Sequence, residues 1–169
     1  MSYGTIEIIS APEDMHTVPT DAVAFEEDTY LVLSADRKFR EPHMPLMKIM
    51  TNLIETRPEL PGSVIVKGKN PARMLAIVHD FNQEPSWREE WIKSALDGIL
   101  QKADSFRFQS VAIPFLGTVH GSLDKHRFVE LFRDALKRVS PKFLKHIRLC
   151  VPIGTNPKIF DVLCSKGWN

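Results

Sequence analysis

The sequence has little cysteine and no excess of either charge. Among its 169 residues are two cysteines, 22 basic and 21 acidic side chains, which leaves a formal charge of +1. A near-neutral chain with scattered basic residues offers no electrostatic footprint for nucleic acid or an anionic membrane. Cys150 and Cys164 belong to no Cys-x-x-Cys pair, so we expect buried thiols in a reducing compartment.

Long apolar runs and a targeting signal are also lacking. No apolar stretch reaches the roughly 18–20 residues that a membrane span requires, and residues 1–7 lack the basic start and apolar stretch of a signal peptide. We therefore expect a cytoplasmic protein, and the length fits one domain spanning 1–169. The histidines show no metal-ligand spacing, so neither a metal site nor a cofactor is predicted.

After residue 60 the pattern alternates between strands and helices. Short apolar runs predict buried strands at 63–67, 74–79, 109–114 and 147–151. Apolar residues at helical spacing predict helices that follow Ser86, Gly121 and Ile159, the first with a Ser86/Glu89 capping box. This alternation predicts a three-layer α/β/α fold around a parallel or mixed sheet.

The first 60 residues are less regular. β-branched and apolar runs predict strands at 5–9, 21–26 and 29–33, and the last two could pair as a hairpin. Apolar residues at helical spacing, several of them methionine, predict a helix over about 45–56.

The most informative stretch is the loop that follows the predicted strand at 109–114. Gly117 and Gly121 interrupt it before the next helix begins. A strand, a glycine-bearing loop and a helix start can hold a phosphate, because backbone N–H groups approach the anion and the helix dipole favours it. The alternative is that both glycines only permit a tight turn. If they bind phosphate, Gly121→Val should remove binding with little loss of stability, whereas Gly117→Val should cost both.

Several strings resemble the macro domain, an ADP-ribose-binding α/β/α module. Residues 62–66 (Gly-Ser-Val-Ile-Val), 75–79 (Leu-Ala-Ile-Val-His) and 110–118 (Ser-Val-Ala-Ile-Pro-Phe-Leu-Gly-Thr) are similar to three of its strands and the loop after the third. A weaker resemblance covers the first strand, Asp14-Met15 and Asp21-Ala22-Val23. The resemblance implies that Asp14 accepts a hydrogen bond from an adenine amino group; a turn carboxylate is the alternative.

The chain departs from that family where the family holds its ribose. Phe25-Glu26-Glu27-Asp28 replaces the family's Asn-Ala-Ala-Asn, and 34–40 contains no glycine where the family has a glycine-rich run. Phenylalanine cannot replace an asparagine amide as donor and acceptor, and added carboxylates repel a diphosphate. The three acidic residues could alternatively form a metal or base site, or a solvated hairpin turn.

The candidate ligand-binding residues are Asp14, Phe115, Leu116, Gly117, Thr118, Val119, His120, Gly121 and Ser122. The catalytic candidates are His120 and Asp28, since an imidazole or a carboxylate can move a proton near neutral pH. His120 could equally be an exposed loop residue, and His79 is expected to be a hydrogen-bonded structural histidine.

Three functions remain open from the sequence. The first is binding of a phosphate-bearing, nucleotide-like ligand, such as ADP-ribose, without efficient catalysis. The second is hydrolysis of ADP-ribosyl or phosphate esters. The third is a degenerate macro fold kept for protein contacts.

Overall fold

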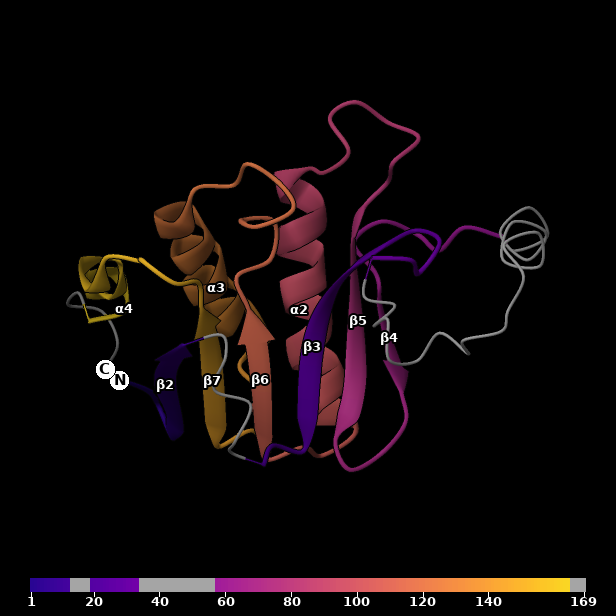
Figure 1. Cartoon of the computed structure of the whole chain (residues 1–169). Coiled ribbons are helices and arrows are strands. Elements are labelled where there is room, and N and C mark those ends of the chain that lie inside the picture. Colours follow the sequence, from indigo (N-terminus) through magenta and orange to yellow (C-terminus); the bar gives the residue numbers. More distant parts are fainter. Residues whose placement is uncertain (13–18, 34–56, 165–169) are drawn as a thin grey trace.

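The computed structural model describes residues 1–12, 19–33 and 57–164, which build a seven-stranded mixed sheet (Figure 1). Across the sheet the strand order is β1-β2-β7-β6-β3-β5-β4. The strands are β1 (Ser2–Tyr3), β2 (Ile6–Pro12), β3 (Ala22–Asp28), β4 (Val64–Lys67), β5 (Ala72–His79), β6 (Ser110–Pro114) and β7 (His146–Val151). The predicted helix over 45–56 and Asp14 lie outside the described residues.

The five inner strands run parallel. β2, β7, β6, β3 and β5 pair in parallel register, and β1 and β4 add an antiparallel strand at either side. Their carboxyl ends therefore meet at one edge of the sheet, the upper edge in Figure 1, which we call the carboxyl edge. β6 lies between β7 and β3, as expected for the strand that leads into the glycine-bearing loop.

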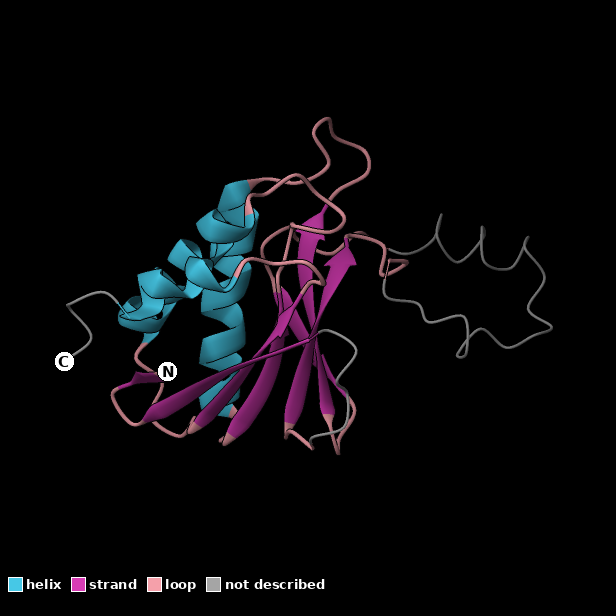
Figure 2. Ribbon diagram, turned by 60° about the vertical axis from the view of Figure 1, so that its left-hand side comes forward, coloured by secondary structure: helices cyan, strands magenta, loops and turns pink. Residues whose placement is uncertain are grey.

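The fold is of the three-layer α/β/α type, and the described helices pack together on one face of the sheet. α2 (Glu89–Ser105) and α3 (Lys125–Val139) pack side by side on one face (Figure 2), and η1 (Pro157–Phe160) and α4 (Asp161–Cys164) follow β7. Apolar side chains of α2 and α3 are buried against β5 and β6; each stabilises the fold by about 1.5–3 kcal/mol. Leu75 and Ile77 are also buried but lie outside this core, because alternate β5 residues point to opposite faces.

Three local predictions were wrong. Residues 29–33 form turns instead of a strand, because buried carboxylates before them bind their backbone N–H groups. α2 begins at Glu89 without a side-chain cap, since Trp87 pairs with His79 and keeps the preceding backbone extended. Neither cysteine forms a disulfide within the described residues, but Cys164 is exposed on the short α4 and Cys150 is only half-buried.

None of the helices in the described ranges has the length and apolar character needed to cross a bilayer.

Candidate functional site

The glycine-bearing loop, residues 115–122, lies at the carboxyl edge between β6 and α3 (Figure 1). Its start is fixed to the core: Phe115 and Leu116 are buried, and Phe115 stacks on Phe128 of α3 with ring centroids 4.5 Å apart. Their side chains therefore cannot touch a ligand in solvent. The donors of Thr118 are also used within the protein, because both its N–H and its hydroxyl donate to the Phe115 carbonyl.

The later part of the loop, residues 119–122, is open to solvent, whereas Gly117 is buried. Within the described part of the chain, the backbone N–H groups of Gly117 and of residues 119–122 donate to no protein acceptor. Val119 is 56% exposed, and His120 and Ser122 are exposed as well. Several backbone donors close together in a turn suit an anion. The start of α3 was expected to help bind the anion. Part of its donor capacity is used within the protein, because Asp124 caps α3 by accepting from Arg127 N at 3.0 Å.

The two glycines are packed, which corrects the expectation that Gly121 tolerates valine. Gly117 has φ +75°, and a Cβ there would lie 2.3 Å from Ile92 Cδ1 of α2. A Cβ on Gly121 would lie 2.6 Å from the Gly117 carbonyl oxygen and 3.1 Å from the Trp87 ring. The loop is thus folded on itself, and valine at either position must distort it.

An apolar pocket of about 370 Å³ opens at the same edge, at the ends of β2 and β7. Pro12, Val151, Ile153 and Phe160 are among its lining residues. Phe160 also contacts Phe115 edge-on, with ring centroids 6.4 Å apart, so this pocket adjoins the loop. It is large enough for a flat heterocycle.

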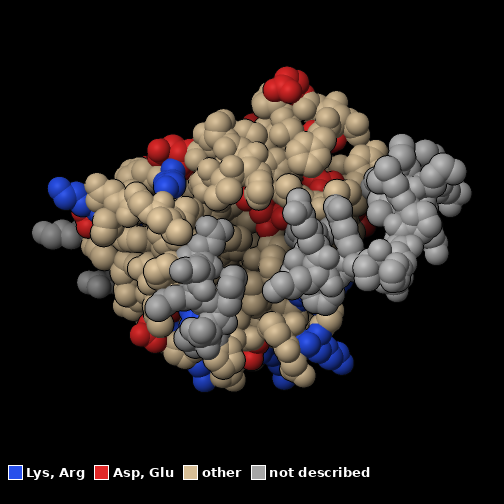
Figure 3. Space-filling model, viewed as in Figure 1, with Lys and Arg blue, Asp and Glu red and all other residues tan. Residues whose placement is uncertain are grey.

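The three acidic residues 26–28, whose role the sequence did not decide, lie at the end of β3. The alternative that they form a solvated hairpin turn is wrong. Glu27 and Asp28 are both buried. Asp28 accepts from the N–H groups of Tyr30 (2.7 Å), Val32 (2.9 Å) and Leu33 (2.7 Å), and Glu27 accepts from Leu33 at 2.8 Å. These carboxylates shape the 29–33 turn. Figure 3, viewed as in Figure 1, shows acidic atoms in a recess near the middle of the molecule.

Sequence reasoning missed a buried pair beside the loop. Glu26 Oε1 contacts His79 Nε2, and their side chains are 8% and 0% exposed. The His79 ring stacks on Phe81 at 5.8 Å between centroids and meets the His120 ring edge-on at 6.4 Å. The structure therefore brings His120 next to His79. Asp28, in contrast, accepts the hydrogen bonds that hold the 29–33 turn. No spacing rule links residues 26, 79 and 120, so only the fold could reveal this group.

Two buried polar atoms lack a partner in the part of the chain that the structure describes: His79 Nδ1 and Thr29 Oγ1. Their residues are neighbours, since Thr29 N donates to the His79 carbonyl at 3.0 Å. An unpaired buried group costs about 1–3 kcal/mol.

Among the described residues, no cluster of acidic, histidine or cysteine side chains could hold a metal ion.

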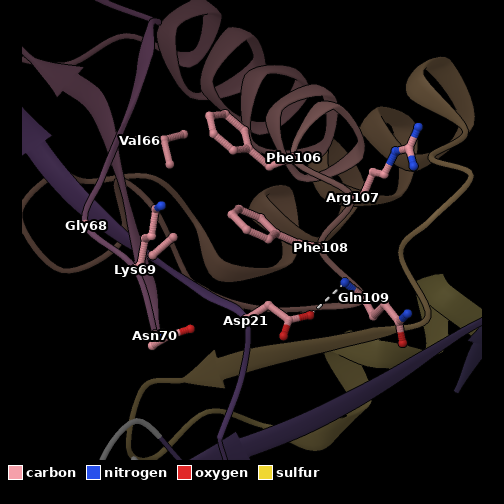
Figure 4. Close-up of a pocket in the computed structure, with 10 residues that line it drawn as sticks. Asp21, Val66, Gly68, Lys69, Asn70, Phe106, Arg107, Phe108 and Gln109 are labelled. Carbon is pink, nitrogen blue, oxygen red and sulfur yellow. Dashed lines mark hydrogen bonds between the residues drawn. The ribbon is translucent and has the colours of Figure 1, made fainter.

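A second pocket, of about 430 Å³, lies at the opposite edge, where β3, β5 and β6 begin (Figure 4). The Phe106 and Phe108 rings point into it, whereas Arg107 turns away and lies over the Phe143 ring at 5.3 Å. Asp21 accepts from the N–H groups of Gln109 and Ser110 at 2.7 and 3.0 Å. The Asp21 carboxylate is thus used within the fold.

A parallel-cored sheet with a loop at its carboxyl edge places the chain among α/β folds, in which ligands commonly lie at the strand ends. No protein-family model and no curated protein sequence matches this chain.

Solved structures place it more narrowly. It is similar to the macrodomain of Thermus aquaticus DarG (15% identity, TM-score 0.64, 86% of this chain and 99% of that one). It is also similar to the Oceanobacillus iheyensis macrodomain with ADP (11%, 0.68, 98% and 92%) and the GDAP2 macro domain (9%, 0.65, 93% and 82%). The chain has the macro-domain fold.

Proposed function

We propose that this protein binds a phosphate-bearing, nucleotide-like ligand, with ADP-ribose as the leading candidate. The observation that carries the proposal is the set of backbone N–H groups at residues 119–122, at the carboxyl edge of a central strand, that donate to no acceptor among the described residues. Backbone donors bind phosphate without a basic side chain. Structures of the Oceanobacillus macrodomain carry ADP or ADPR, which supports the same ligand class here.

The apolar pocket supplies the second half of the site. A base placed there would lie against Phe160, whose ring touches Phe115 at the start of the loop. Aromatic contacts of this kind contribute about 0.5–1.5 kcal/mol beyond buried area. The proposal therefore expects AMP to bind more tightly than ribose 5-phosphate, since only AMP carries a base.

The charge of the edge limits which phosphates fit. Glu26, Glu27 and Asp28 stand together at the end of β3, beside the loop. Carboxylates repel each additional negative charge on the ligand. ADP-ribose, whose two phosphates are joined and capped by sugars, should therefore bind more tightly than ATP.

Isothermal calorimetry with ADP-ribose, AMP, ribose 5-phosphate and ATP tests the proposal. Val119→Asp adds a charge to the exposed loop, and Val119→Asn is its uncharged control of similar size. We expect Asp to weaken AMP binding about tenfold, about 1.4 kcal/mol, and added salt to reduce the difference. Phe106→Asp places the same charge at the opposite edge and should leave affinity unchanged.

Two results would contradict the proposal. One is heat indistinguishable from dilution for all four compounds at ~1 mM, a concentration that requires only about 4 kcal/mol of affinity. The other is equal AMP affinity in the Val119→Asp and Val119→Asn proteins, because the phosphate would then lie elsewhere.

A further inference from the structure

The pocket at the opposite edge of the sheet is built around two aromatic rings (Figure 4). Phe106 and Phe108 stack with ring centroids 5.5 Å apart and an angle of 15° between the ring planes. Phe108 packs against the core, whereas Phe106 is 53% exposed. The open face of the stack therefore belongs to Phe106, and a third flat ring can continue it in the offset arrangement that aromatic pairs prefer.

The backbone at the end of α2 holds both rings in place. Arg107 N donates to the Asp104 carbonyl at 3.0 Å. Phe108 N donates to the Ala103 carbonyl at 2.8 Å. Arg107 has φ +57°, in the left-handed region that glycine usually occupies after a helix end. This turn directs Phe106 and Phe108 into the pocket and Arg107 away from it, so the rings are ordered before a ligand arrives and less entropy is lost on binding.

Polar side chains face the rings from the turn between β4 and β5. Figure 4 shows the Lys69 amine across the pocket from the Phe106 and Phe108 rings, with Asn70 next along the same turn. Lys69 and Asn70 are exposed, and neither side chain has a hydrogen bond or an ion pair to another described residue. An amine and a carboxamide can both donate to a carboxylate. The strand side of the pocket therefore offers donors opposite the aromatic surface.

The charges that line the pocket favour an anion. Lys69 and Arg107 bring two positive charges and Asp21 one negative charge, which leaves an excess of one positive charge. The N–H groups of Gln109 and Ser110 donate to the Asp21 carboxylate and offset part of its charge. An anionic group placed at Lys69 is thus attracted to this side of the pocket.

We propose that this pocket binds a planar aromatic carboxylate, with its ring on the face of Phe106 and its carboxylate at Lys69 and Asn70. The volume of about 430 Å³ accommodates one or two fused rings. A nucleotide lacks this shape, because a puckered ribose separates its base from its charge. The inference is independent of the proposed function, since the loop at 115–122 lies at the other edge of the sheet.

Calorimetry with three related compounds tests the ligand class. We expect naphthoate to bind with a Kd of at most about 1 mM. Naphthamide, which has the same ring without the charge, should bind about fivefold more weakly. Cyclohexanecarboxylate, which has the charge without a flat ring, should bind at least about tenfold more weakly. Absence of saturable naphthoate binding, or equal affinity for naphthoate and either of the other compounds, would overturn the proposal.

Two variants with matched controls test the residues. Phe106→Leu keeps an apolar side chain but removes the ring face, and should weaken naphthoate binding about tenfold. Its control, Phe81→Leu, replaces a phenylalanine that is 58% exposed at the carboxyl edge and should keep the wild-type affinity. Lys69→Gln should weaken naphthoate binding about fivefold and leave naphthamide binding unchanged, whereas Lys93→Gln on the exposed side of α2 should change neither. Melting curves confirm that each variant is folded; wild-type naphthoate affinity in Phe106→Leu would contradict the proposal.

A further measurement locates the ligand without a variant. In ¹⁵N-labelled protein, naphthoate should shift the backbone resonances of residues 68–70 and 106–109 and leave those of residues 119–122 in place. Saturating AMP should not change the naphthoate affinity. If naphthoate shifts residues 119–122 instead, or if AMP displaces it, the proposal is wrong, and the separate AMP titration still decides the proposed function.

Discussion

The two edges of the parallel sheet differ in what their polar groups do. At the opposite edge, Asp21 binds two backbone N–H groups and Asp104 binds those of Lys142 and Phe143, at 2.6 and 2.9 Å. At the carboxyl edge, Asp28 binds backbone N–H groups in the same way, but the N–H groups of residues 119–122 and His79 Nδ1 have no partner among the described residues. A closed hydrogen-bond network holds a fold together, whereas open groups offer a ligand contacts that the protein has not used.

The largest effect should come from breaking the closed part of the carboxyl edge. Asp28→Ala removes the acceptor of three backbone N–H groups, so we expect a loss of about 3–5 kcal/mol in the free energy of unfolding. Urea denaturation measures it. Asp28→Asn keeps one acceptor oxygen and should lose less; equal losses below 1 kcal/mol in both would show that the turn does not depend on the carboxylate.

Steric crowding of the loop should cause the second-largest loss of stability. Gly121→Val drives a side chain into the Gly117 carbonyl and Trp87, so a loss of about 2–3 kcal/mol and weaker AMP binding are expected. The control is Gly68→Val at the opposite edge, where a Cβ meets nothing within 4 Å and only the φ of +70° is unfavourable. Thermal melts with and without AMP compare the two; a larger loss at Gly68 would reverse the comparison.

Removal of the Asp21 carboxylate at the opposite edge should lower stability without changing ligand affinity. Asp21→Ala leaves the N–H groups of Gln109 and Ser110 to water, which we expect to cost about 1–2 kcal/mol because the site is exposed. AMP affinity, measured by calorimetry on the folded variant, should stay at the wild-type value. A tenfold loss of affinity would mean that the two edges are not independent.

The smallest effect concerns an exposed ion pair between the first turns of α2 and α3. The hydrogen bond from Arg127 lowers the pKa of Glu89 below its ordinary value of 4.5. A lowered pKa gives stability that is present above the ordinary value and is lost as pH falls through the lowered one. With the side chains 45% and 43% exposed, solvent limits the contribution to about 0.5 kcal/mol.

Denaturation at pH 7 and pH 3 of wild-type and Arg127→Gln proteins checks this sign. The variant should be slightly less stable than wild type at pH 7, and this difference should be smaller at pH 3. The same difference at both pH values would exclude the ion pair as its cause.

Local patterns were enough for the central fold. The apolar run ending at Pro114, the break at Gly117 and the helical spacing after it predicted β6, the loop and α3, because burial on both faces and helix periodicity act over neighbouring residues. The strand expected at 29–33 failed because its apolar composition cannot reveal that Asp28 binds its N–H groups. Asp14 and the other site assignments stay predictions, since they depend on a ligand.

The Glu26–His79 pair shows the same limit at the site. Its members are 53 residues apart and meet because β3 and β5 are neighbours in the sheet. A glutamate in one apolar strand and a histidine ending another carry no signal of pairing until the strand order is known. Chemistry assembled across strands therefore has to be read from the fold.

The position of β2 has a consequence for the order in which the chain can fold. Apart from the two-residue β1, its sheet partner is β7, so Glu7 meets His146 across 139 residues of sequence. Closing a loop of that length costs about 2 kcal/mol more entropy than closing a ten-residue loop. During synthesis the N-terminal strand has no parallel neighbour until residue 151 has been made. Pairing of β2 with β7 is therefore the step that completes the sheet.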